Sequence, residues 1–279
     1  MKFIQKIMMV GGLCMLLSIP TKAQQIDQSV VEAILKSFPS HLEITFLLKD
    51  LGTPYNAKLF NPASRAKNYS TKYQQALNLG IYSTSLGFTM LYEQPDDTPP
   101  YLAAIQHLAK DLQVAQVFDR ERIEYFLNEK NKFDSLLLET NTNLEKINAE
   151  LFKTNRADLA TLMLLGSWLE SLYLASRAYI KSPQDFLKGR IEEQKIILEQ
   201  FLLLLSFYEN QEMMQLTQSL NPLQQLYIKS VVIKNETDSI ATGSLVMVNG
   251  PDQANFTPQD IAQILQITTQ IRTKIIQGK

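Results

Sequence analysis

Two segments of the chain are long, apolar and almost free of charge. Residues 74–92 contain no charged side chain, and residues 159–175 contain only Glu170. In both segments apolar residues recur at spacings of three and four, which is typical of helices and not of strands. A helix that is apolar on every side must be surrounded by other elements. The segments therefore predict two buried central helices, over 70–93 and 156–180.

The remaining segments repeat the helical spacing but keep one polar face. They predict helices over 30–38, 42–51, 101–112, 120–151 with a break near 128–133, 184–208, 212–220, 222–234 and 258–276. The 10 Gly and 11 Pro residues are scarce, and most of the prolines fall between these segments or at their first residues. We therefore predict an all-α fold: a compact multi-helix bundle, in one domain over 24–279, with at most a short β element near 243–248.

The two apolar segments share a sequence pattern. "LGIYSTSLGF" (79–88) and "LGSWLESLYL" (165–174) have the same residue at four of their aligned positions. Glycine inside a helix costs about 1 kcal/mol relative to alanine, so we expect Gly80 and Gly166 to allow a close approach of two helix backbones. The pattern has two explanations. One is an internal repeat that gives two pseudo-symmetric halves, and the other is chance similarity between Leu-rich helices.

Glu170 is the charged residue of the second segment. A buried carboxylate must be paired, hydrogen-bonded or protonated. Arg177, seven residues later on the same helical face, is the predicted partner, together with a tyrosine hydroxyl. One interpretation is that Glu170 fixes the register of the core. The other places Glu170 with Tyr82, Trp168 and Tyr173 in a ligand-binding pocket.

Several chemistries lack the residues that they need. The chain has two histidines, His41 and His107, far apart and without a metal-binding spacing. It has no GxGxxG, no GxxxxGK[ST] and no GxSxG motif. We therefore predict no metal and no cofactor. The net charge is −1 and no basic stripe is present, so nucleic acid is not an expected partner.

The N-terminus has the pattern of a secretory signal. Lys2 and Lys6 form a basic segment before an apolar run over 7–19, and a small-residue cleavage site ends at Ala23. We predict that residues 1–23 are removed and that the mature chain is exported, periplasmic or secreted, without a transmembrane segment. Leu13 precedes Cys14 where a lipoprotein signal needs a small residue, so a lipid anchor is not expected.

Four segments, taken together, resemble a known family. They are "PSHLEITFLLKDLGTPYN" (39–56), "ALNLGIYSTSLGFTMLY" (76–92), "NKFDSLLLE" (131–139) and "LLGSWLESLYLASR" (164–177). The chain is similar to exported all-helical proteins and lipoproteins of Gram-negative bacteria, a family without a known activity. The resemblance implies export and a helical fold, and it assigns no functional residue. The family pattern has an Asp where this chain has Thr84-Ser85.

The sequence leaves two main hypotheses for function. The first is a non-enzymatic binding or interaction module of the cell envelope, with an unknown protein or small-molecule partner. The alternative is a hydrolase-type enzyme that uses carboxylate and hydroxyl groups in a groove between helices 70–93 and 156–180. Peripheral membrane association is a third possibility, without a basic amphipathic helix to support it. Whether Glu170, Trp168 or Tyr82 borders an open cavity distinguishes the first two.

Overall fold

The computed structural model describes residues 28–38, 42–117, 119–128, 132–235 and 256–278. These residues form eleven α-helices and three short 3-10 segments, and the described part of the chain contains no strand. The prediction of an all-α fold is therefore confirmed. The predicted signal segment, residues 1–23, and the predicted β element near 243–248 lie outside the described residues.

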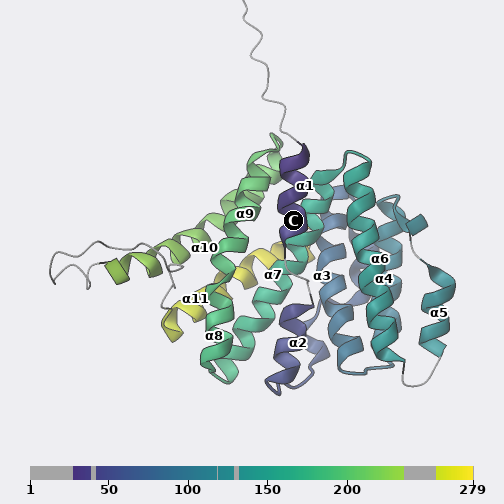
Figure 1. The fold of residues 1–279 in the computed structure, drawn as a ribbon, viewed down its shortest axis with the longest axis horizontal. Helices are drawn as coiled ribbons and strands as arrows, with labels where there is room; N and C mark the ends of the chain where they lie inside the picture. Colours follow the sequence, from purple (N-terminus) through teal and green to yellow (C-terminus); the bar gives the residue numbers. More distant parts are fainter. Residues whose placement is uncertain (1–27, 39–41, 118, 129–131, 236–255, 279) are drawn as a thin grey trace, which may run out of the picture.

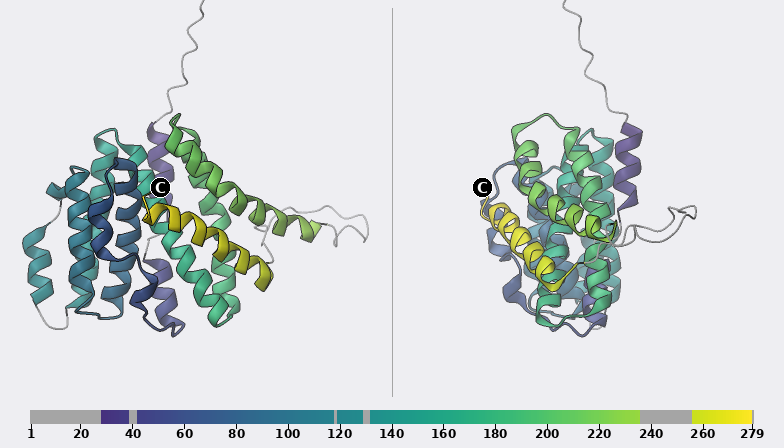
Figure 2. Two further views of the ribbon diagram at one scale, coloured as in Figure 1. Left: turned by 180° about the vertical axis from the view of Figure 1, so that it is seen from behind. Right: turned by 90° about the vertical axis from the view of Figure 1, so that its left-hand side faces the viewer.

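The helices form a bundle around α3 and α7 (Figure 1). They are α1 (Gln28–Ser37), α2 (Glu43–Asp50), α3 (Lys72–Leu91), α4 (Thr98–Asp111), α5 (Arg120–Asn128), α6 (Phe133–Lys153), α7 (Ala157–Lys181), α8 (Asp185–Glu192), α9 (Gln194–Ser206), α10 (Gln211–Asn235) and α11 (Pro258–Ile276). The 3-10 segments are η1 (Ala57–Leu59), η2 (Ala63–Asn68) and η3 (Ala115–Val117). Figure 2 shows α11 lying across α7, with α10 running outward beside it.

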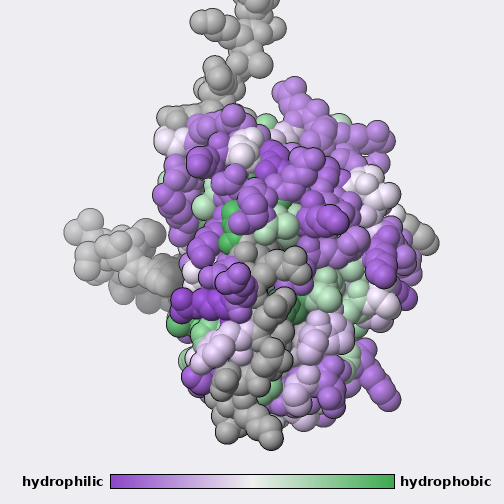
Figure 3. Space-filling model, turned by 90° about the vertical axis from the view of Figure 1, so that its right-hand side faces the viewer, coloured by the Kyte–Doolittle hydropathy of each residue, from purple (hydrophilic) through white to green (hydrophobic). Residues whose placement is uncertain are grey.

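Both predicted central helices are buried. A capping box of Thr71 and Gln74 begins α3, and every residue from Gln75 to Leu91 is buried. Helix α7 is long and apolar enough to cross a membrane, but 94% of its most apolar window is buried inside the bundle. By contrast, the outer face formed by α5 and α6 is mostly hydrophilic (Figure 3). The contrast between central and outer helices follows the distribution of charge in the sequence.

Helices α3 and α7 are parallel and touch through their glycines. A Cβ atom on Gly80 would lie 1.9 Å from the Met163 carbonyl oxygen, and one on Gly166 would lie 2.1 Å from that of Leu77. The two contacts are equivalent. In each, a glycine of one helix meets the carbonyl of the residue three positions before the glycine of the other helix, Met163 before Gly166 and Leu77 before Gly80. The predicted close approach is confirmed. The internal repeat stays a prediction.

Two helix boundaries differ from the prediction. Segment 184–208 forms α8 and α9, which meet at Glu193, where the Gln194 side-chain amide donates to the Arg190 carbonyl. Segments 212–220 and 222–234 form one helix, α10, with Pro222 inside it. Leu220 and Leu223 are both fully buried, so core packing on each side outweighs the cost of about 3 kcal/mol for an internal proline.

The connection between α2 and α3 packs against the bundle. Phe60, Asn61 and Tyr69 are buried in it. Asn61 donates to the Tyr69 hydroxyl (2.8 Å), which in turn donates to the Ile276 carbonyl (3.1 Å) at the end of α11. The connection therefore joins the N-terminal half of the chain to its last helix.

Candidate functional site

Glu170 is fully buried in α7 and is paired with Arg272 of α11. The Arg272 guanidinium donates one hydrogen bond to Glu170 Oε1 over 2.8 Å and a second to Oε2. The prediction that Arg177 is the partner of Glu170 was wrong, because the Arg177 side chain is exposed at the surface. Spacing along one helix could not reveal the partner, because the packing of α11 on α7 brings it from the other end of the chain.

The pair belongs to a small polar cluster. Burial raises the pKa of Glu170, and the adjacent Arg272 opposes that shift. Arg272 also donates to the Leu59 carbonyl (2.9 Å), and its guanidinium lies 4.6 Å from the centre of the Tyr173 ring. Arg177 donates to the Tyr173 hydroxyl over 3.4 Å. Tyr173 therefore contacts two arginines.

Tyr82 and Trp168 have different surroundings. The fully buried Tyr82 donates to the Pro62 carbonyl (3.0 Å), and its ring contacts those of Tyr69 and Tyr101. The Trp168 indole donates to Gln194 (2.9 Å) and borders a cavity of ≈ 50 Å³. Of the four predicted site residues, the structure brings Glu170 and Tyr173 together and leaves Tyr82 and Trp168 outside their cluster.

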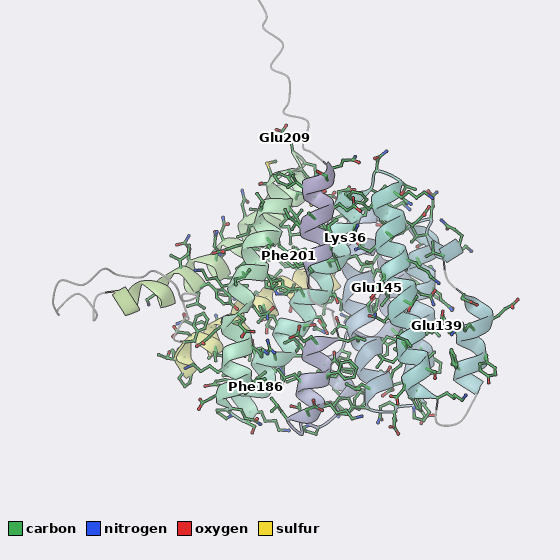
Figure 4. All side chains as sticks on the ribbon, viewed as in Figure 1. Lys36, Glu139, Glu145, Phe186, Phe201 and Glu209 are labelled. Atoms are coloured by element: carbon green, nitrogen blue, oxygen red, sulfur yellow. The ribbon has the colours of Figure 1, made fainter. Side chains whose placement is uncertain are left out.

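Phe201 lines the small cavity at Trp168. Its ring stacks on Phe38 at 4.3 Å and lies 5.4 Å from the Trp168 ring. Figure 4 labels Phe201 where α9 lies beside α1. The Ser171 hydroxyl faces the same cavity and has no hydrogen-bond partner among the described residues. A volume of ≈ 50 Å³ has room for water but not for a drug-sized ligand.

A larger cleft lies beside the cluster and reaches Leu48 of α2. It has a volume of ≈ 410 Å³ and is formed by the α2–η1 connection, α3, α7 and α11. We call it the α7 cleft. It is lined by Leu48, Thr53, Pro54, Tyr55, Asn56, Leu59, Phe60, Phe88, Leu174, Arg177, Ala178, Ile180, Lys181 and Leu265.

The polar cluster positions two residues of the α7 cleft. Arg272 holds the carbonyl of Leu59, which lines one wall. Tyr173 accepts a hydrogen bond from Arg177, which lines the rim. Glu170 and Tyr173 thus support the cleft from behind without lining it. Their role is to position neighbouring groups.

The α7 cleft carries unbalanced positive charge. Arg177 and Lys181 lie one turn apart on α7, and no Asp or Glu is among the lining residues. Neither cation forms a salt bridge within the described part of the chain. Tyr55 donates to Asp97 (2.7 Å), and burial raises the pKa of Tyr55, so its hydroxyl stays neutral.

Two other openings among the described residues have balanced charges. Glu43 and Arg190 line the Trp168 cavity and lie 3.5 Å apart. A groove of ≈ 630 Å³ between α10 and α11 carries Glu212 and Lys274 among several amide side chains. In the described ranges, no three His, Cys, Asp or Glu side chains gather as they would around a metal ion.

Sequence reasoning missed Arg272, although a signal was present. Arg272 follows Thr268 by one helical turn, on the face of α11 that carries Ile261, Ile264 and Ile275. A basic residue on an apolar face predicts a buried partner. The irregular residues 53–60 gave no comparable signal, because no periodicity says which of their side chains face inward.

Comparison of the chain with models of protein families, with curated proteins and with solved structures finds no match.

Proposed function

We propose that this chain is an exported binding protein of the cell envelope, without catalytic activity, whose ligand occupies the α7 cleft. The observation that carries the proposal is the cleft itself. Its volume of ≈ 410 Å³ falls in the range of about 300–1,000 Å³ that small-molecule sites occupy. Its walls are mainly apolar, with a few polar groups at the rim, which is the usual composition of such sites.

The predicted site residues support binding better than catalysis. Both carboxylate oxygens of Glu170 accept hydrogen bonds from Arg272, and the Tyr82 hydroxyl is bonded to a backbone carbonyl. The α3 and α7 backbones touch at Gly80 and Gly166, which leaves no groove there. Nearer Phe88 and Leu174 the cleft opens between the same helices, but no carboxylate lines it. Trp168 does border an opening, but its volume of ≈ 50 Å³ has room for water and not for a drug-sized molecule, so it does not favour the hydrolase alternative.

Export is supported by the N-terminal sequence. Lys2 and Lys6, the apolar run over 7–19 and the small residue Ala23 form a complete secretory pattern. N-terminal sequencing of the protein from its own host is expected to begin at Gln24, with the protein in the periplasmic or secreted fraction. A chain that retains residues 1–23 in the cytoplasm would contradict this part of the proposal.

Native mass spectrometry tests the binding function. The mature protein, purified gently from its own host, is expected to carry an additional mass that is lost on collisional activation. Ala178→Phe places a large side chain in the α7 cleft and is expected to remove that mass. Ala149→Phe is the matched control, because Ala149 is an exposed alanine on α6.

Two results would contradict the binding proposal. One is a wild-type protein that is recovered folded but without any bound molecule. The other is a bound molecule that persists unchanged in Ala178→Phe. Circular dichroism and the thermal midpoint of both variants show whether the loss of ligand reflects a blocked cleft or an unfolded protein.

A further inference from the structure

We infer that the ligand of the α7 cleft is an amphipathic anion, with an apolar body and one acidic head group such as a carboxylate or a phosphate. The inference rests on the proposed binding function and names its ligand class. It is carried by the uncompensated charge of the cleft, which distinguishes this opening from the other two.

The positive charges of Arg177 and Lys181 indicate that the ligand has an acidic head group. They lie four residues apart on α7, so their side chains are neighbours on one helix face. Both are exposed at the rim, and neither is neutralised by a carboxylate among the described residues. An anion between them would form charge-assisted hydrogen bonds, which are about twice as strong as neutral ones.

Tyr173 holds the Arg177 side chain in place. Its hydroxyl accepts one hydrogen bond from the Arg177 guanidinium, and its ring lies 5.7 Å from the guanidinium carbon. A guanidinium has five N–H donors, so four remain for a ligand. Arg272, which also contacts the ring, is already paired with Glu170. Arg177 is therefore the arginine of this cluster that an external anion can reach.

The apolar floor of the cleft indicates that the ligand has an apolar body. Leu48, Phe60, Phe88, Leu174 and Ala178 are buried and provide an apolar surface. A neutral apolar ligand would fill the floor but would remove water from two cations without giving them a partner, which is costly. A cationic ligand would be repelled. An amphipathic anion satisfies both the floor and the rim.

Three probes with the same twelve-carbon chain length and head groups of different charge test the inference. Dodecanoate, dodecanol and dodecyltrimethylammonium, each below its solubility limit or micellar concentration, are titrated into the mature wild-type protein by calorimetry. We expect dodecanoate to bind at least tenfold more tightly than either of the others, with an affinity that falls as salt is added. Equal affinity for dodecanoate and dodecyltrimethylammonium would overturn the inference.

Variants of the rim identify the residues responsible. Arg177→Gln is expected to weaken dodecanoate at least tenfold, and Lys181→Gln less, because no contact in the described structure orients Lys181. Tyr173→Phe removes the anchor of Arg177 and is expected to weaken dodecanoate severalfold while leaving dodecanol unchanged, a difference that loss of packing would not produce. Lys146→Gln, at an exposed lysine of α6, is the matched control. Unchanged dodecanoate affinity in the Arg177→Gln/Lys181→Gln double variant would overturn the inference.

The acidic head could belong to a free acid or to a lipid, and vesicles distinguish these sources. Sedimentation with phosphatidylglycerol vesicles that is lost in the double variant assigns a lipid head group. Binding of dodecanoate without sedimentation assigns a free acid. Either result supports an acidic head, and sedimentation that the double variant retains in full contradicts it.

The inference and the function on which it rests can fail separately. If the host-purified protein carries a molecule that Ala178→Phe excludes, but the probes show no preference for the anion, the binding function stands and the ligand class is wrong. If no molecule is carried and no probe binds, both fail.

Discussion

Glu170 and Arg272 form a buried ion pair between α7 and α11, across 102 residues of sequence. The pair closes a chain of contacts from the core to the surface: Arg272 holds Leu59 and packs on Tyr173, and Tyr173 holds Arg177. A group that first suggests a catalytic carboxylate thus serves to fix two walls of a cleft. Its energetic role leads to the first two predictions.

Replacing Arg272 with methionine leaves the Glu170 carboxylate buried without a partner. We expect Arg272→Met to lower the free energy of unfolding by about 3–5 kcal/mol at neutral pH. Removing one member of a buried pair leaves the other charge buried, and no partner then offsets its desolvation cost. Urea denaturation measures this change. The double variant Glu170→Leu/Arg272→Met is expected to recover most of the loss, and a purely additive double variant would contradict the pairing.

The stability of Arg272→Met is also expected to depend on pH. Burial already raises the pKa of Glu170 in the wild type, and loss of the guanidinium removes the opposing effect. A carboxyl whose pKa is higher in the folded state binds more protons there, so stability is greatest below its unfolded pKa and falls as pH rises through the folded pKa. The deficit of the variant relative to wild type is therefore expected to be smaller at pH 4.5 than at pH 7.5. An equal deficit at both values would refute this.

Adding a methyl group at the α3–α7 contact is expected to destabilise the bundle. Gly80→Ala and Gly166→Ala each place a Cβ atom against a carbonyl oxygen of the opposite helix, which side-chain movement cannot relieve. We expect each to cost about 1–3 kcal/mol or more, despite the higher helix propensity of alanine. Gly189→Ala is the control. Nothing lies within 4 Å of its added Cβ, so it is expected to stabilise α8 by up to about 1 kcal/mol.

Tyr92 is expected to contribute to unfolding at alkaline pH. Its hydroxyl donates to the Thr53 carbonyl (2.7 Å) beside the α7 cleft, and burial together with Asp50 raises its pKa to about 12. Because an unfolded tyrosine ionises near pH 10, stability is full below that value and falls as pH rises toward 12. Tyr92→Phe is expected to cost about 1 kcal/mol at pH 7 and to flatten this fall.

The control for the alkaline experiment is Tyr125→Phe, because Tyr125 is exposed on α5. It is expected to change neither the stability at pH 7 nor the shape of the pH profile. Thermal midpoints of the wild type and both variants, taken at intervals from pH 7 to pH 12, provide the comparison. A Tyr92→Phe profile that falls as steeply as the wild type would show that the Tyr92 hydroxyl does not carry the effect.

Two hydroxyls on the central helices are expected to respond differently to removal. Ser171 has a buried hydroxyl without a partner among the described residues, so Ser171→Ala is expected to be neutral or slightly stabilising. The Thr84 hydroxyl lies 2.8 Å from that of Ser167 on the opposite helix. Thr84→Val is therefore expected to cost about 1–3 kcal/mol, since it leaves Ser167 buried without that contact. Urea denaturation of both variants tests the contrast.

The sequence by itself determined the fold class and the central helices. Helical spacing and the absence of charge over 74–92 and 159–175 are local properties, and a segment that is apolar on all sides has only the core in which to lie. The glycines at 80 and 166 likewise indicated a close backbone contact. The helix breaks at Glu193 and the continuity through Pro222 were missed, because packing decides them and local propensity does not.

Only the tertiary structure decided which residues meet. Glu170 needed a partner, but the sequence could not choose Arg272 over Arg177, because the contact depends on how α11 crosses α7. The α7 cleft is also a tertiary feature: an irregular connection, two helix ends and the last helix each contribute a wall. Periodicity reports which face of a helix is buried, and it carries no information about which distant face covers it.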